Sequence, residues 1–219
     1  MTPFVDIHTH VNFRSNNTIA LLSVRAGVDN SVPHHPFSVG IHPWDAGLVN
    51  EDPELLLQSF LPLHPAAIGE IGLDSLHSTS TIDQQSSLFR KQLYFAHSNN
   101  LPVIIHSVRT LQQILRIMDD FPSVKAVFHS FIGNRIQAQQ IIDRGHFISA
   151  GLTSLASHKT LDALSYIPAN RLFLETDDNL SPIQTVYNIA AEKLALKPVS
   201  LIYQIYLNYS QLFNSHGNS

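Results

Sequence analysis

Six side chains of the kinds that bind metal ions are spread along this 219-residue chain. Each lies at or just beyond the end of a short apolar segment that has the composition of a β-strand. Four imidazoles and two carboxylates in such places form a donor set suited to one or two divalent cations. The six are His8, His10, Glu70, His106, His129 and Asp177.

The first two imidazoles, His8 and His10, are two residues apart. In a strand, the side chains of residues i and i+2 point to the same side, so both rings can face one cation. Histidines at this spacing also occur in cores and loops, and such a pair alone is a weak signal. The preceding Phe4-Val5-Asp6 places the pair at the end of a first strand. We therefore expect both to be metal ligands.

Glu70 lies within the apolar segment Ala67–Leu73. Burying a carboxylate there is costly unless a cation or a basic side chain neutralises it. Lys and Arg are scarce, 13 in total, which disfavours a buried ion pair. The neighbouring Gly69 and Gly72 allow a bulky group to approach the backbone. A carboxylate can place one oxygen on each of two metals, so Glu70 is predicted to bridge them, and Asp74 either supports the ligands or forms a turn.

The remaining ligands follow later apolar segments. His106 and His129 end two of them in equivalent places, at the carboxyl ends of strands, where barrel enzymes build their active sites. Asp177 ends the last such segment and can both ligate a metal and accept a proton from a bound water. Asp178 follows at once, and we favour Asp177. The predicted catalytic residues are Asp177 and Glu70.

Three further residues are predicted to contact the substrate. His42 and Trp44 follow a strand in Gly40-Ile41-His42-Pro43-Trp44. The indole can stack on a base or a sugar, although a packed loop aromatic is an equally good interpretation. Arg109 lies three residues beyond His106, within reach of an anionic group. The other histidines are expected to be structural or exposed; they are His34, His35, His64, His77, His97, His146, His158 and His216.

The elements that must position these residues alternate along the chain. The later strands are continuously apolar, as parallel strands buried on both faces are. Eight strands separated by helices predict an α/β fold, a TIM (β/α) barrel. The predicted strands are Phe4–His8, Ile19–Val24, Phe37–His42, Ala67–Leu73, Pro102–His106, Ala126–His129, Phe147–Ala150 and Leu172–Thr176. The predicted helices are Asp83–Asn99, Leu111–Asp120, Arg135–Arg144, Ile183–Leu196 and Val199–Phe213; the tyrosines of the last are expected in the core.

The first third is too short for a complete barrel of this kind. About 30 residues separate His10 from Ile41, fewer than two βα units need. We therefore expect shortened or missing helices there. With no linker or internal repeat, residues 1–219 are predicted to form a single domain.

Composition excludes some classes of function. There is no Cys, which rules out disulfides and thiolate zinc sites and leaves nitrogen and oxygen ligands. The net charge of −4 gives no general attraction to nucleic acid, although a local patch can still bind phosphate. No apolar segment approaches the roughly 20 residues of a membrane span, and no signal segment is visible. A cytoplasmic location without a membrane partner is therefore expected.

In this order, the motifs resemble those of the TatD family of metal-dependent hydrolases. The matching segments are Asp6-Ile7-His8-Thr9-His10, Gly40-Ile41-His42-Pro43, Ile68-Gly69-Glu70-Ile71-Gly72-Leu73-Asp74, Leu101-Pro102-Val103-Ile104-Ile105-His106-Ser107, His129-Ser130-Phe131 and Leu174-Glu175-Thr176-Asp177. The family is a TIM-barrel branch near the amidohydrolases; many members are DNases, several of them 3′→5′ exonucleases, and some relatives deacylate D-aminoacyl-tRNA.

The resemblance implies one or two divalent metal ions, with Zn, Mg or Mn all suitable. It implies that one metal is bound by four of the residues above and a second by three, with Glu70 shared. The first set is His8, His10, Glu70 and Asp177; the second is Glu70, His106 and His129. Such cations polarise a phosphoryl or acyl oxygen, activate water and stabilise the leaving oxygen.

The chain departs from the family in its substrate loops. Ser130 and Ile132 replace residues of the family's His-Cys-Phe-Ser-Gly stretch, and the Arg- and Asn-rich segment that normally follows Asp177 is absent. The leading hypothesis is a deoxyribonuclease that hydrolyses phosphodiester bonds at DNA ends. The alternative is a metal-dependent ester or amide hydrolase acting on a small metabolite or on aminoacyl-tRNA. A barrel that only binds is disfavoured because all six ligands are present. DNA or another phosphate ester is the expected partner, and no obligate protein partner is evident.

Overall fold

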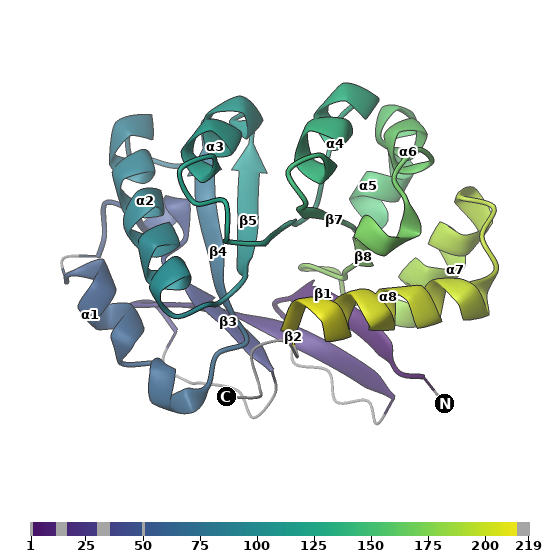
Figure 1. The fold of residues 1–219 in the computed structure, drawn as a ribbon, viewed down its shortest axis with the longest axis horizontal. Coiled ribbons are helices and arrows are strands. Elements are labelled where there is room, and N and C mark those ends of the chain that lie inside the picture. The colour runs from purple at the N-terminus through teal and green to yellow at the C-terminus, as the bar shows by residue number, and fades with distance from the viewer. Residues whose placement is uncertain (1, 12–16, 30–35, 50, 214–219) are drawn as a thin grey trace. The chain divides into compact units, whose positions relative to one another are not determined.

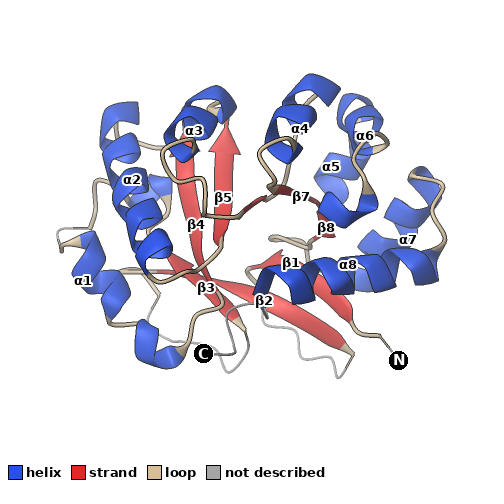
Figure 2. Ribbon diagram, in the orientation of Figure 1, coloured by secondary structure: helices blue, strands red, loops and turns tan. Residues whose placement is uncertain are grey.

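The computed structural model of the chain describes residues 2–11, 17–29, 36–49 and 51–213, in which three strands are followed by alternating helices and strands (Figures 1 and 2). The strands are β1 (Phe4–Thr9), β2 (Thr18–Arg25), β3 (Phe37–Gly40), β4 (Ala67–Asp74), β5 (Val103–Val108), β6 (Ala126–Phe128), β7 (Phe147–Ala150) and β8 (Leu172–Leu174). The helices are α1 (Pro53–Gln58), α2 (Ile82–Ser98), α3 (Leu111–Met118), α4 (Arg135–Ile142), α5 (Leu152–Ala156), α6 (His158–Leu164), α7 (Ile183–Lys193) and α8 (Pro198–Phe213). Three short 3₁₀ turns add η1 (Pro43–Asp45), η2 (Leu61–Leu63) and η3 (Ala169–Arg171).

The strand order in the sheet follows the order of the strands in the chain, from β1 to β8. The registered pairs are parallel. The last strand returns to the first, because Thr9 and Asp177 form a parallel bridge just beyond β8. Eight parallel strands in this order, connected through helices from β3 onward, are the TIM barrel that the alternation of apolar segments predicted.

Two compact units divide the chain. The first comprises residues 1–22 and 127–219, and it contains β1, β7, β8 and the helices from α4 to α8. The second comprises residues 23–126, with β3, β4, β5 and the helices from α1 to α3. The boundaries fall within β2 and β6. A single domain over residues 1–219 stays a prediction.

The first third has the reduced form that its length predicted. Among the described residues, no helix lies between β1 and β2 or between β2 and β3, and the first α-helix is α1. The predicted strand at Phe37–His42 ends at Gly40, so His42 lies beyond the strand. The predicted strand at Leu172–Thr176 likewise ends at Leu174. His42 and the residues from Glu175 to Asp177 therefore lie in loops that follow the strand ends.

Helix α2 shows where the sequence pattern was imprecise. The acidic Asp83 was expected to open this helix, but the helix begins at Ile82 and its cap is Thr81. The Thr81 hydroxyl accepts the Gln84 N–H at 3.2 Å, and the Gln84 side chain accepts the Thr81 N–H at 2.9 Å. This reciprocal pair is a capping box, which satisfies two otherwise unpaired donors.

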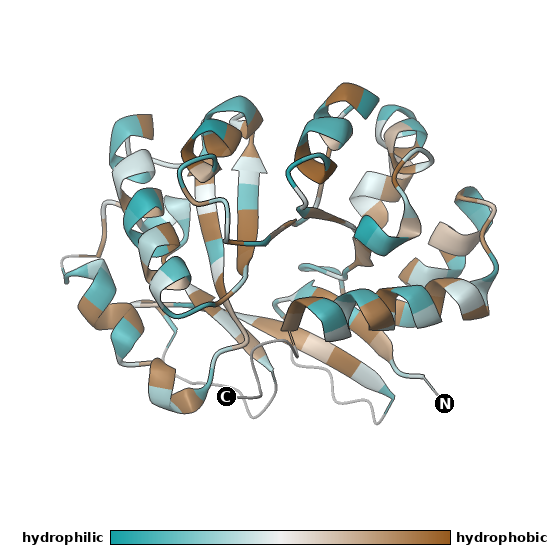
Figure 3. Cartoon of the chain, in the orientation of Figure 1, coloured by the Kyte–Doolittle hydropathy of each residue, from teal (hydrophilic) through white to brown (hydrophobic). Residues whose placement is uncertain are grey.

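The surfaces of the helices alternate between hydrophilic and hydrophobic residues, as helices that cover a sheet do (Figure 3). In α8, Tyr209 is buried as expected, whereas Tyr203 is exposed and does not belong to the core. The short helices α1, α5 and α6 were not predicted. Among the described residues, none of the helices has the length and apolarity needed to span a bilayer.

Candidate metal centre

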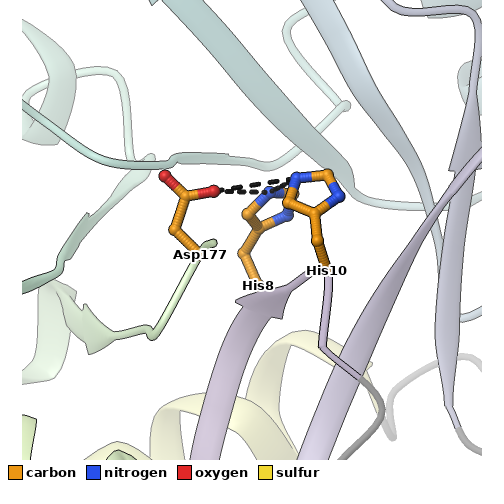
Figure 4. Close-up of side chains that lie close together, drawn as sticks. All are labelled: His8, His10 and Asp177. Carbon is orange, nitrogen blue, oxygen red and sulfur yellow. Dashed lines mark hydrogen bonds and ion pairs between the residues drawn. The ribbon is translucent and has the colours of Figure 1, made fainter. Parts of the chain in front are cut away.

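In the first unit, the side chains of His8, His10 and Asp177 point toward one another (Figure 4). The two Nε2 atoms are 3.2 Å apart. Asp177 Oδ1 lies 3.8 Å from His8 Nε2 and 3.7 Å from His10 Nε2. Donors bonded to one tetrahedral cation at about 2.0–2.2 Å lie about 3.3–3.6 Å from one another. The three donors therefore fit one metal ion.

Backbone hydrogen bonds hold this group together. The N–H of Asp177 donates to the His8 carbonyl at 3.0 Å, and the N–H of His10 donates to the Asp177 carbonyl at 3.1 Å. Asp177 adopts a positive φ of 56°, which is uncommon for a residue with a side chain. Non-glycine residues held in this region cluster at functional sites. Asp178, the competing carboxylate, is exposed.

A buried carboxyl, Asp6, supports the same region. Its oxygens accept the Thr176 N–H at 3.0 Å and the Thr176 hydroxyl at 2.7 Å. Burial raises the pKa of Asp6 to about 7, and the hydrogen bonds from Thr176 oppose this rise. Asp6 thus ties the middle of β1 to the residue that precedes Asp177.

The first unit contains a second group of candidate metal ligands, and one of them, Glu175, was not predicted from the sequence. His129, Glu175 and Asp177 have ligand atoms close enough to share an ion. Glu175 is fully buried; its Oε1 accepts the Ser130 N–H at 2.5 Å and lies 3.8 Å from His129 Nδ1. Its Oε2 is buried and, among the described residues, has no hydrogen-bond partner.

A buried carboxylate oxygen without a partner is costly, and a nearby cation removes that cost. Glu175 could have been found by the argument that selected Glu70, because it too is a carboxylate within a predicted apolar strand, Leu172–Thr176. The imidazoles of His8 and His129 also lie close together, with ring centroids 4.3 Å apart. The first unit therefore brings together four of the six predicted ligands and adds Glu175.

In the second unit, Glu70 and His106 lie side by side on β4 and β5. Glu70 Oε1 is 2.5 Å from His106 Nδ1. Glycines make this approach possible: a Cβ on Gly72 would lie 2.0 Å from the His106 carbonyl oxygen, and Gly72 has a φ of +144°. A Cβ on Gly69 would lie 2.6 Å from Ile104 Cβ. The bulky group that the flanking glycines accommodate is thus the neighbouring strand.

Asp74 fixes the hydrogen-bonding state of His106. Its Oδ2 lies 3.1 Å from His106 Nε2 and 2.7 Å from Trp44 Nε1. Burial would raise the pKa of Asp74, but hydrogen bonds from Trp44, from the N–H groups of His77 and Leu76 and from His106 outweigh it and hold the pKa well below its usual range. An ionised carboxylate only accepts, so His106 Nε2 carries a hydrogen. His106 Nδ1 then faces Glu70, and a divalent cation, when bound, would take the place of a proton between them.

His42 lies close to the same pair. Its Nε2 is 3.2 Å from Glu70 Oε1 and 3.4 Å from His106 Nδ1, near enough to join them on an ion. However, its Nδ1 accepts the Trp44 N–H at 3.2 Å, so a neutral ring carries its hydrogen on Nε2. Burial lowers the pKa of His42, which favours the neutral ring. We therefore assign His42 as a donor to Glu70 and not as a ligand.

The other two predicted substrate residues lie at the surface. The Trp44 indole is 42% exposed although its Nε1 is held by Asp74. Arg109 is exposed and has a positive φ of 57°. No contact in the described structure assigns either residue to a substrate, and their roles stay predictions.

Two buried glutamines of α2 position the second unit's site. Gln92 accepts the Ile41 N–H at 2.7 Å and donates to the Ile41 carbonyl at 3.0 Å, directly before His42. Gln85 accepts the Asp74 N–H at 2.8 Å and donates to the Asp74 carbonyl at 3.1 Å. Residues seven apart share one face of a helix. The sequence analysis missed both, because glutamine is ordinarily an exposed residue in helices.

A TIM barrel with clustered imidazoles and carboxylates defines the class of metal-dependent hydrolases. A family model described as TatD related DNase matches residues 28–205. The chain therefore belongs to the TatD-related family, as its motifs predicted.

Relatives and solved structures agree with this family. An uncharacterized metal-dependent hydrolase of Haemophilus influenzae is 29% identical over 216 residues, covering 82% of each chain. The 3′-5′ ssDNA/RNA exonuclease TatD of Salmonella typhimurium is 31% identical over 155 residues, which cover 66% of this chain and 58% of that protein. The crystal structure of the Escherichia coli TatD homologue YjjV has a TM-score of 0.82 at 24% identity, covering 96% of this chain and 98% of that one, which shows the shared fold.

Proposed function

We propose that this protein is a metal-dependent phosphodiesterase that hydrolyses the ends of single-stranded DNA. The observation that carries the proposal is the convergence of His8 Nε2, His10 Nε2 and Asp177 Oδ1 within 3.8 Å. The name of the Salmonella exonuclease supports the substrate class. The chain aligns with little more than half of that relative, so the substrate is a proposal and not an inherited property.

The donor sets fit divalent cations that prefer nitrogen and oxygen, such as Zn, Mg or Mn. We propose that His8, His10 and Asp177 hold one cation, and that Glu70, His106 and His129 are metal ligands as well, as the motifs predict. When bound, such cations lower the pKa of water and stabilise the negative charge that develops on the phosphate.

Four side chains have further roles in the proposed reaction. Asp177 accepts the proton that the attacking water gives up, because its carboxylate lies beside the two imidazoles. His42 donates from Nε2 to Glu70 and so holds that carboxylate in one orientation. The exposed face of Trp44 stacks on a base, and Arg109 attracts the phosphate backbone.

A second candidate is hydrolysis of a small ester or amide with the same metals. The observation that favours it is the short connection after Asp177, where only five residues separate the ligand from the start of α7 at Ile183. That connection contains no basic side chain, unlike a typical surface for nucleic acid.

The test is a time course on end-labelled single-stranded DNA with Mg²⁺ or Mn²⁺, with Glu70→Ala as the control. The proposal predicts a ladder that shortens from one end and is absent in the variant. A metal-loaded protein that leaves DNA intact but cleaves small esters would replace this proposal with the second candidate.

A further inference from the structure

We propose that His77 is a catalytic residue which donates a proton from Nε2 to the leaving oxygen, with Asp74 as its positioning partner. This inference rests on the proposed phosphodiesterase activity and extends it. His77 had been expected to be structural or exposed, and it is not among the predicted ligands.

The pairing of the two side chains fixes which nitrogen faces the substrate. Asp74 Oδ2 lies 3.0 Å from His77 Nδ1. A carboxylate can only accept a hydrogen bond, so Nδ1 carries a hydrogen and donates it. Nε2 is then the nitrogen that can exchange a proton with a substrate. The His77 side chain is 60% exposed, and a substrate can reach it.

Asp74 is held in place independently of the His77 ring. Its Oδ1 accepts the backbone N–H of Leu76 at 2.7 Å and that of His77 at 2.9 Å. These two bonds already close the turn after β4. The ring-to-carboxylate contact is therefore not needed to form the turn, and an exposed ring packs little against the core. The arrangement matches that of an imidazole oriented by a carboxylate for acid–base chemistry.

The position of the pair connects it to the predicted metal ligands. The same Oδ2 that accepts from His77 also lies 3.1 Å from His106 Nε2 and 2.7 Å from Trp44 Nε1. The charged or titratable groups that face Asp74 are thus His77 and His106. The Trp44 ring, predicted to stack on the substrate, lies 6.0 Å from the His77 ring between centroids. A substrate stacked on Trp44 would therefore lie near His77.

The reaction balances as follows. The oxygen of the attacking water bonds to phosphorus, and the proton that the water loses passes to the base of the proposed reaction. The bond between phosphorus and the leaving oxygen breaks, and that oxygen takes the Nε2 proton of the His77 imidazolium. The products are a phosphate monoester and an alcohol. Solvent then returns a proton to His77 and removes one from the base.

The dependence of the rate on the leaving group tests this role. An alkyl alcohol leaves poorly without a proton, whereas p-nitrophenolate leaves readily without one. We therefore compare the methyl ester and the p-nitrophenyl ester of thymidine 5′-monophosphate, in wild type and in His77→Asn. Asparagine keeps a donor for Asp74 but has no equivalent of Nε2. His97→Gln is the matched control, because His97 is an exposed histidine on α2 whose Nδ1 lies 2.8 Å from the Ser123 hydroxyl.

General acid catalysis typically contributes about 10²–10⁴-fold. His77→Asn should lower kcat for the methyl ester at least about 100-fold and leave kcat for the p-nitrophenyl ester within about 3-fold. His97→Gln should leave both unchanged. An equal loss on both esters, or no loss on either, would overturn the assignment. Wild type that cleaves neither ester and no DNA would instead refute the proposed function.

Discussion

At the scale of single residues, chemistry that depends on type and spacing was predictable, and chemistry that depends on contacts was not. The spacing of His8 and His10 predicts a shared face, and the structure places both Nε2 atoms 3.2 Å apart. Glu175 was missed although it is fully buried. Its place in the apolar segment Leu172–Thr176 was a signal in the sequence, but the buried oxygen without a partner among the described residues appears only in the folded chain. The same is true of the tautomer that Asp74 imposes on His106.

Removing the carboxylate of Glu70 tests the ligand assignment at this scale. Glu70→Ala should lower hydrolysis at least about 100-fold, because the predicted shared ligand is lost. The fold should persist, and circular dichroism and urea unfolding will check it. Glu51→Ala is the matched control, since Glu51 is an exposed carboxylate in the same unit. Full activity in Glu70→Ala would show that the site lies elsewhere.

The buried carboxyl of Asp6 predicts a pH dependence of stability. Its pKa is raised from 3.8 to about 7 in the folded state, so between these values the folded chain binds more protons than the unfolded chain. Stability must therefore fall as pH rises through this window, by about 4 kcal/mol at most.

The check is urea unfolding between pH 4 and 8 of wild type and Asp6→Asn, both treated with a chelator to remove metal ions. As pH rises, the unfolding free energy of wild type should fall relative to that of the variant. A difference that does not change with pH would contradict the raised pKa of Asp6.

At the scale of elements, the five longest helices were predicted from their helical spacing, but their role in the site was not. Helix α2 was predicted within one residue at each end, because its apolar face is periodic. Gln85 and Gln92 on that face hold Asp74 and Ile41 through paired backbone hydrogen bonds. Helix α7 acts similarly in the first unit, where the Tyr187 hydroxyl accepts the Val5 N–H at 3.2 Å and donates to the Val5 carbonyl at 3.0 Å.

Replacing Gln92 by Leu tests this function of α2. The variant should leave the Ile41 N–H and carbonyl without partners, which costs about 1–3 kcal/mol. It should also lower kcat more than it raises KM, because His42 follows Ile41 directly. Urea unfolding and steady-state kinetics measure the two effects. Gln139→Leu, at an exposed position on α4, is the control, and equal behaviour of the two variants would refute the positioning role.

At the scale of the whole molecule, the fold class and the strand order followed from the alternation of apolar segments. The return of β8 to β1 could not be deduced from those segments, because it depends on backbone bonds such as that between Asp177 and His8. Shortened or missing helices in the first third were predicted from the number of residues alone. Among the described residues, no helix lies between β1 and β2 or between β2 and β3. Family membership adds the class of reaction, while the shortened connection before α7 leaves the substrate to be measured.

Metal binding should stabilise the whole chain, because the unfolded chain lacks a formed site. A cation at 100 times its dissociation constant adds about 2.7 kcal/mol to the unfolding free energy. Chelator-treated protein should therefore unfold at a lower temperature than protein with added Mn²⁺ or Zn²⁺, and the shift should grow with metal concentration. The same increase in a His8→Ala, His106→Ala double variant would show that the cations bind at other places.

The most direct measurement for the central claim is a calorimetric titration of chelator-treated protein with Zn²⁺ or Mn²⁺. We predict at least one tight cation per chain in wild type, and loss of that binding in His10→Ala, whose Nε2 lies in the group of Figure 4. His97→Gln should bind as wild type does. If wild type binds no more metal than His10→Ala, the clustered imidazoles and carboxylates are not a metal centre.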